Sequence, residues 1–223
     1  MKKFTLILMG WMIGQGLMAQ DSLSQRFYVG LNIEFNRAYR SIQCSDDLTD
    51  LKTTFDSLET PMIGKRFGLS FGYGLSPKAS IESGLMYSQY GYNIDTLQEA
   101  NLNNIKYRFT YIEIPVLVNY RLFNLGNWQM NTTLGWRNCL MIRSEIFYQS
   151  IEDRQQQKQD EATEKNRFQL MPQVGIGFSK TLMNSYILKL NANHSFSVTP
   201  MTEGDFKRKN FSTGIQLSLC KTL

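Results

Sequence analysis

The residues with the clearest chemical potential are a histidine and a serine that are direct neighbours. His194 is the only histidine in the chain, and Ser195 follows it. A histidine that accepts the proton of a serine hydroxyl can turn that hydroxyl into a nucleophile for acyl transfer. Both residues, however, lie in an alternating segment typical of a β-strand, where successive side chains point to opposite faces. We therefore expect no catalytic pair here, and the chain is predicted not to be an enzyme.

Acidic side chains gather in a polar stretch, residues 37–64. Its carboxylates, which could in principle bind calcium, are Asp46, Asp47, Asp50, Asp56 and Glu59. Their spacing does not match an EF-hand loop. Apolar residues in the same stretch recur instead at helical spacing: Leu48, Leu51, Phe55 and Leu58. We expect a short surface helix here, with no metal and no cofactor.

The cysteines do not form a recognisable site either. Cys44 falls in a predicted loop, whereas Cys139 and Cys220 fall on the polar faces of predicted strands. Their spacing fits neither a zinc site nor a dense disulfide framework. The chemical state of the three thiols stays open.

The first 19 residues have the pattern of a secretory signal peptide. Lys2 and Lys3 precede an apolar run that is too short for a membrane-spanning helix, and Ala19 ends the segment. We therefore expect a signal peptide at 1–19 and one domain at 20–223. Without the two lysines the formal net charge falls from +5 to +3, which is too low to predict nucleic-acid binding.

Period-two alternation of apolar and polar side chains runs through most of the remaining chain. It is clearest in residues 107–142, where two alternating arms are joined by a link in which Gly126 can adopt the positive φ of a hairpin turn. Similar segments are 27–36, 65–75, 79–92, 167–179, 186–196 and 210–221. With the two arms of the hairpin, these segments make eight predicted strands.

The connections between these strands alternate between long and short. Barrels of the bacterial outer membrane have this pattern, with short periplasmic turns and long outer loops. The strands also suit the roughly 9 to 11 residues that a tilted strand needs to cross a bilayer. A soluble lipocalin-like barrel, with its apolar face inward, is the alternative. We predict an all-β fold, an eight-stranded antiparallel up-and-down transmembrane β-barrel in the outer membrane.

Aromatic residues near the predicted strand ends also favour the membrane. Aromatic side chains are enriched where a bilayer meets water, in one girdle at each interface. We expect a lipid-facing girdle that includes Phe27, Tyr73, Tyr111, Tyr120, Trp128, Trp136, Phe168, Phe178, Tyr186 and Phe211.

The polar face carries charges that a barrel would enclose. Buried charge is costly unless it is matched, and counting along the strands places acidic and basic side chains at similar depths on neighbouring strands. We predict three lumen ion pairs: Glu34–Arg66, Glu82–Arg121 and Glu113–Arg137. Because eight strands leave room only for side chains, the lumen is predicted to be plugged. Pro115, also on this face, should mark a bulge or a missing ladder bond.

The hairpin also carries a resemblance to a known family. Residues 111–121 read YIEIPVLVNYR, residues 68–78 read GLSFGYGLSPK, and Ala19-Gln20 forms the signal junction. In these features the chain resembles the PorT-like outer-membrane β-barrel family of Bacteroidetes. The resemblance implies an eight-stranded outer-membrane barrel and, for the founding branch, a part in type IX secretion of surface and extracellular proteins.

Three functions remain open at this point. The first is a structural or interaction protein, expected to be a monomer, that contacts outer-membrane lipid and meets an envelope protein through residues 37–64 and 143–166. The second is an accessory component of a type IX secretion system. The third is an outer-leaflet lipid hydrolase, which the opposite directions of His194 and Ser195 disfavour.

Overall fold

The computed structural model describes seven segments of the chain, residues 27–44, 58–97, 102–150, 156–160, 166–182, 185–201 and 206–223. The predicted signal peptide lies outside them, as does the predicted surface helix apart from Leu58. Within these segments, no helix is long and apolar enough to cross a membrane.

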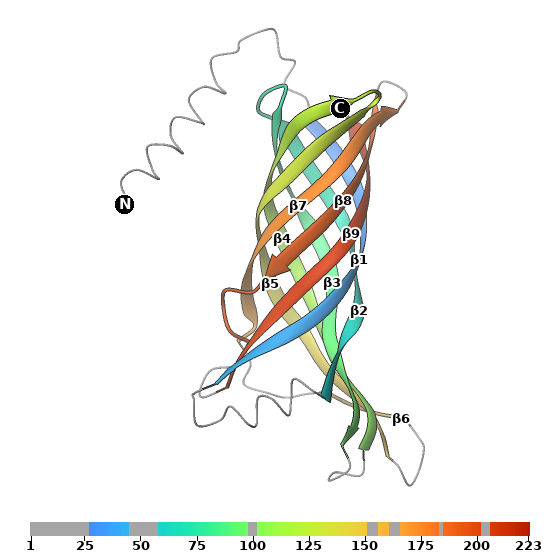
Figure 1. Ribbon diagram of the computed structural model, residues 1–223, viewed down its shortest axis with the longest axis vertical. Helices are drawn as coiled ribbons and strands as arrows, with labels where there is room; N and C mark the ends of the chain where they lie inside the picture. The colour runs from blue at the N-terminus through green and yellow to red at the C-terminus, as the bar shows by residue number, and fades with distance from the viewer. Residues whose placement is uncertain are drawn as a thin grey trace, which may run out of the picture.

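Eight long strands form one closed antiparallel ring, which confirms the predicted fold (Figure 1). They are β1 (Phe27–Cys44), β2 (Glu59–Gly74), β3 (Ala79–Leu97), β4 (Leu102–Leu125), β5 (Trp128–Ser150), β7 (Phe168–Leu182), β8 (Tyr186–Phe196) and β9 (Phe206–Thr222). Each strand pairs with its neighbours in the chain, and β1 pairs with β9 to close the ring. A further short strand, β6 (Gln156–Asp160), pairs with the far end of β5.

The strands are longer than the alternation predicted. The predicted loops at 37–64 and 143–166 contain the ends of β1, β2 and β5 and the whole of β6. β4 and β5 have 24 and 23 residues, about twice what a tilted strand needs to cross a bilayer. Figure 1 shows β3, β4 and β5 continuing past the other strands at the end opposite the C-terminus. Alternation fades there because apolar side chains such as Tyr92, Ile94 and Ile105 take the enclosed face.

Burial alternates along the strands in the sense expected for a membrane barrel. On β1, Leu31 and Phe35 are 64% and 60% exposed, whereas Asn32 and Glu34 are 7% and 2% exposed. The outer face is therefore apolar and the enclosed face polar, an arrangement that lipid stabilises and water does not. The soluble lipocalin-like alternative requires the reverse arrangement.

Two local features match their predictions. Gly126 has a φ of 57° in the two-residue turn between Leu125 and Trp128, which pair with each other. Pro115 lies on the enclosed face, and the β3–β4 ladder skips from Ser83↔Val116 to Met86↔Glu113 without a change of register. Because proline has no N–H to donate, its place in the ladder is left without a bond, and no bulge forms there.

The outward apolar face gives a first testable prediction. Leu69 lies midway along the outward face of β2 and is 54% exposed. Replacing it with arginine should lower the free energy of unfolding in lipid vesicles by about 2–4 kcal/mol, the cost of a cation near the bilayer midplane. Ile63, further along the same face and opposite Arg37, is the matched control. Ile63→Arg should cost about 0–1 kcal/mol because it lies beyond the bilayer centre. Equal losses in urea titrations of both variants would contradict the membrane face assigned here.

Candidate functional site

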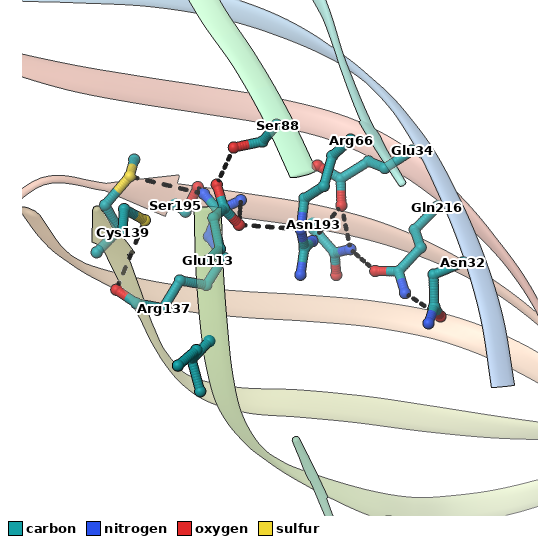
Figure 2. A network of polar contacts seen from close by, with 12 residues as sticks. Asn32, Glu34, Arg66, Ser88, Glu113, Arg137, Cys139, Asn193, Ser195 and Gln216 are labelled. Carbon is teal, nitrogen blue, oxygen red and sulfur yellow. Dashed lines mark hydrogen bonds and ion pairs between the residues drawn. The ribbon is translucent and has the colours of Figure 1, made fainter. Parts of the chain in front are cut away.

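The most highly organised group of side chains lies inside the barrel, around Glu113 on β4 (Figure 2). Glu113 Oε2 lies 3.0 Å from Arg66 Nε and 3.6 Å from Arg137 Nη1. Arg66 also donates from Nη1 to Glu34 Oε2 at 2.8 Å. These four residues, here called the central cluster, contain two acids and two guanidinium groups, so the cluster has no net charge.

Neutral hydroxyl groups complete the surroundings of the central cluster. Ser88 and Tyr90 donate to Glu113 Oε1 at 2.5 and 2.6 Å. Arg137 donates to the Tyr90 hydroxyl at 2.7 Å and to the Ser195 hydroxyl. The side chains that take part in these bonds are almost completely buried: Ser88, Tyr90, Glu113, Arg137 and Ser195. Charge is tolerated at such depth only because each ion has both a counter-ion and hydrogen-bond partners.

An amide chain extends this network around the lumen. Asn193 Nδ2 lies 3.3 Å from Glu34 Oε2 and donates to Gln216 Oε1 at 2.9 Å. Gln216 in turn donates to Asn32 Oδ1 at 3.0 Å. Figure 2 shows these side chains converging from β1, β2, β3, β4, β5, β8 and β9. The network thus ties together strands that are not neighbours in the sheet.

A second ion pair lies nearer the short turns. Lys189 on β8 is 2.7 Å from Glu82 Oε2 on β3, and the Tyr28 hydroxyl donates to the same oxygen at 2.9 Å. The Lys189 ammonium also lies 4.2 Å from the centroid of the Tyr28 ring. Gly72 makes room for this ring, since a Cβ there would lie 2.0 Å from Tyr28 Cζ. Glu82 and Lys189 form a neutral pair that spans the lumen.

The structure brings together two of the three predicted Glu–Arg pairs, and the third is wrong. Glu34 meets Arg66, and Glu113 meets Arg137, although Glu113 is shared between both arginines. Glu82 is instead held by Lys189.

The failed pair has a simple geometric reason. Glu82 pairs with Leu117 across the β3–β4 ladder, so Arg121 lies four residues further along β4. At about 3.3 Å per residue this separates the two by roughly 13 Å along the strand. The ladder pairs Ala79, the first residue of β3, with Tyr120, so β4 runs on to Leu125 beyond the start of β3, and counting each strand from its own turn misplaced Arg121.

An apolar group fills the interior toward the loop end. Its members, here called the apolar cluster, are Ala38, Tyr90, Tyr92, Ile94, Ile105, Phe109, Tyr111, Cys139, Met141, Met171 and Met201. Beside it Arg40 forms an ion pair with Glu59 and donates to the Tyr92 hydroxyl at 2.8 Å. Sequence reasoning missed this layer. Extending the parity of β1 beyond residue 36 would have placed Arg40 inside, and the parity of the predicted strand 79–92 already places Tyr90 and Tyr92 inside.

The predicted girdle residues lie on the outward face, with one exception. Exposed ones are Phe27, Tyr120, Trp128, Trp136, Phe168, Phe178 and Tyr186, and half-buried ones are Tyr73 and Phe211. The prediction that Tyr111 belongs to the girdle is wrong, because its side chain is 0% exposed and its hydroxyl accepts a hydrogen bond from Asn210 Nδ2 at 3.2 Å. It shares the parity of Glu113 and therefore points inward.

The histidine and serine do not form a catalytic pair. His194 lies on the outward face with Nδ1 2.8 Å from Thr213 Oγ1, whereas Ser195 points inward to Arg137. Cys139 and Cys220 are buried and unpaired with each other. Among the side chains that the structure describes, no group of three or more His, Cys, Asp and Glu residues could hold a metal ion.

The central cluster predicts a strong effect of a single truncation. Arg137→Ala should lower the free energy of unfolding by about 3–5 kcal/mol, because it leaves Glu113 with half of its positive partners. Urea unfolding in vesicles, followed by tryptophan fluorescence, measures this loss. Arg143→Ala is the control, since the Arg143 side chain is 62% exposed, and should change stability by less than about 1 kcal/mol. Wild-type stability in the Arg137 variant would contradict the structural role of the cluster.

The corrected partner of Glu82 can be tested separately. We expect Lys189→Gln to destabilise the barrel and Arg121→Gln to leave its stability nearly unchanged, because only Lys189 lies within ion-pair distance of Glu82. A double-mutant cycle with Glu82→Gln should give a coupling free energy of about 1–3 kcal/mol for Lys189 and near zero for Arg121. A coupling free energy between Glu82 and Arg121 instead would support the Glu82–Arg121 pair predicted from the sequence.

Comparisons with known proteins agree with this architecture. A family model described as outer membrane protein beta-barrel domain matches residues 18–203. No curated protein sequence matches significantly.

Among solved structures, Neisserial surface protein A (NspA) is similar at 13% identity and a TM-score of 0.42, covering 86% of this chain and 95% of that one. Ail from Yersinia pestis, solved with the heparin analogue sucrose octasulfate, shares 11% identity at a TM-score of 0.37, with 88% and 99% covered. The β-barrel domain of Pseudomonas aeruginosa OprF shares 12% at 0.39, also with 88% and 99% covered. Identities this low carry no information on function.

Proposed function

Because the chain belongs to the outer membrane protein beta-barrel domain family, we propose that it works in the outer membrane as a non-enzymatic interaction protein with a closed lumen. The family and the fold together place the protein in the outer membrane. The observation that carries the proposal is the interior: its charges are buried and matched, so they serve to fill the barrel and hold it together.

Three successive layers support a closed lumen. The Glu82–Lys189 pair lies toward the short turns, the neutral central cluster lies in the middle, and the apolar cluster lies toward the long loops. An ion on its way through would have to separate matched charges in the first two layers and enter apolar surroundings in the third. Each step costs free energy that water-filled pores avoid.

A closed lumen leaves the loop end as the working surface. There β4 and β5 extend well beyond the length needed to cross a bilayer, and β6 widens the sheet next to β5. Loops and strand extensions held on a rigid barrel are suited to contacts with other molecules. In the orientation usual for such barrels this end faces the cell exterior. Residues 37–64 and 143–166 are the segments proposed to meet an envelope protein.

A part in type IX secretion is the more specific candidate. It is favoured by the hairpin sequence YIEIPVLVNYR at residues 111–121, which resembles the PorT-like family. Under this hypothesis the partner is a component of the secretion machinery, and deletion of the protein abolishes export of its cargo. Normal export from a deletion strain would remove this candidate while leaving the general interaction role intact.

The closed lumen and the interaction surface are tested in two experiments. Full-length protein reconstituted in planar bilayers should give no current steps above the lipid baseline, whereas a porin measured alongside should conduct. Stable conductance would contradict the closed lumen.

The second experiment isolates the loop end. Cross-linking in whole cells followed by purification should recover an envelope protein with the native chain. A variant with residues 151–165 replaced by a glycine-serine linker should lose it, provided that its heat-dependent gel mobility still shows a folded barrel. A matched replacement of the short turn at residues 75–78 should retain the partner. Recovery of the same proteins by both variants would contradict a role for this end.

A further inference from the structure

The outward face changes from apolar to basic toward the loop end. Going along each strand from the apolar belt to the long loops, the first charged residue on the outward face is basic on five strands: Arg37 on β1, Lys65 on β2, Arg108 on β4, Arg143 on β5 and Lys209 on β9. Among the side chains that the structure describes, no acidic residue takes such a position.

The distribution of exposed charge shows the same bias. Exposed charged residues within the described segments are all basic: Arg37, Lys65, Lys78, Arg143, Arg167, Lys207 and Lys221. The acidic residues with described side chains, in contrast, are buried or half-buried. The exposed charge on the part of the outer surface that the structure describes is therefore cationic.

Two of the outward cations on β1 and β2 lie side by side. Phe35 pairs with Lys65 and Arg37 pairs with Ile63, so Arg37 and Lys65 are diagonal neighbours on one face. Such positions are about 7–8 Å apart on adjacent strands. Two long, flexible cationic side chains at this spacing can reach the oxygens of one phosphate group.

Arg108 on β4 and Arg143 on β5 are diagonal neighbours in the same way, but each already has a partner for its positive charge. Arg143 Nη1 lies 3.5 Å from Glu145 Oε1, and the Arg108 guanidinium lies 4.7 Å from the centroid of the Phe147 ring. In contrast, no described acidic side chain lies within ion-pair distance of Arg37 or Lys65. These two exposed cations repel each other, and an anion from outside would relieve that repulsion.

The residues next to this pair identify the kind of anion. Phe35 and Phe67 are 60% and 47% exposed and lie on the belt side of the two cations. A ligand that fits both parts has an anionic head beside Arg37 and Lys65 and apolar chains over the phenylalanine rings. Free phosphate would satisfy only the first part.

We propose that Arg37 and Lys65 bind the phosphate of an acylated lipid headgroup in the outer leaflet, with Phe35 and Phe67 contacting its acyl chains. The site lies at the border between the apolar belt and the basic residues, which is the depth of headgroups in a bilayer. The lipid site does not require a protein partner at the loops, although Arg37 is the first residue of the segment 37–64 proposed to meet one.

Native mass spectrometry of the full-length barrel in detergent tests the site, with lipid A as the probe. Lipid A carries phosphate and several acyl chains, whereas phosphatidylcholine of matched chain length has no net charge. The wild-type barrel should retain lipid A in preference to phosphatidylcholine. Arg37→Gln and Lys65→Gln should each weaken that binding roughly fivefold, the effect of one cation near an anionic surface, and their combination should act roughly multiplicatively.

The control pair lies at the opposite rim. Lys78→Gln combined with Lys221→Gln removes two exposed cations near the short turns and should leave lipid A binding unchanged. Heat-dependent gel mobility verifies that all variants are folded. Equal lipid A binding by the wild type and the Arg37/Lys65 double variant would overturn the proposal, and so would an equal loss in the control pair. Displacement of lipid A by inorganic phosphate at similar concentrations would show that the site takes free phosphate and no lipid.

Discussion

The structure depends on the matching of charge inside a ring of fixed size. Lipid offers no hydrogen-bond partner to the backbone, so the sheet must close on itself, and eight strands then enclose only a narrow interior. Glu113 stands between Arg66 and Arg137 in that interior and is shared by both. A shared carboxylate makes the cluster interdependent, because the removal of any member leaves its neighbours buried without a full set of partners. The contacts that stabilise the barrel thus also fill its interior.

The sequence was most informative about which side chains point into the barrel, because side-chain direction alternates regularly along a strand. Side chains alternate between faces with a period of two, and from the sequence alone this places Glu34, Arg66 and Pro115 inside. The same rule, applied consistently, would have placed Tyr111 inside as well, since it lies two residues from Glu113. The two-residue turn at Gly126 was equally accessible, because a positive φ and its neighbours on the two arms are local features.

Contacts across the lumen could not be read from the sequence in this way. Lys189 and Glu82 lie on β8 and β3, with three strands between them in the ring, and Arg137 on β5 reaches Ser195 on β8 past β7. Such contacts depend on the shear of the ring, which sets how far each strand is shifted relative to the next. The apolar cluster was missed for another reason: apolar residues such as Ile94, Ile105 and Met141 take the enclosed face, where the alternation predicts polar ones.

The pairing of β1 with β9 has a consequence for how the protein can form. Residues 28–44 are matched with residues 206–222 over an unbroken register, so the ring joins segments that lie at opposite ends of the described chain. Contacts of such sequence separation form late, since a long loop must be closed before they contribute any stability. Until β9 arrives, β1 presents an open edge, and an open edge invites pairing with other chains. The interval before β9 pairs with β1 is therefore when the chain is most exposed to aggregation.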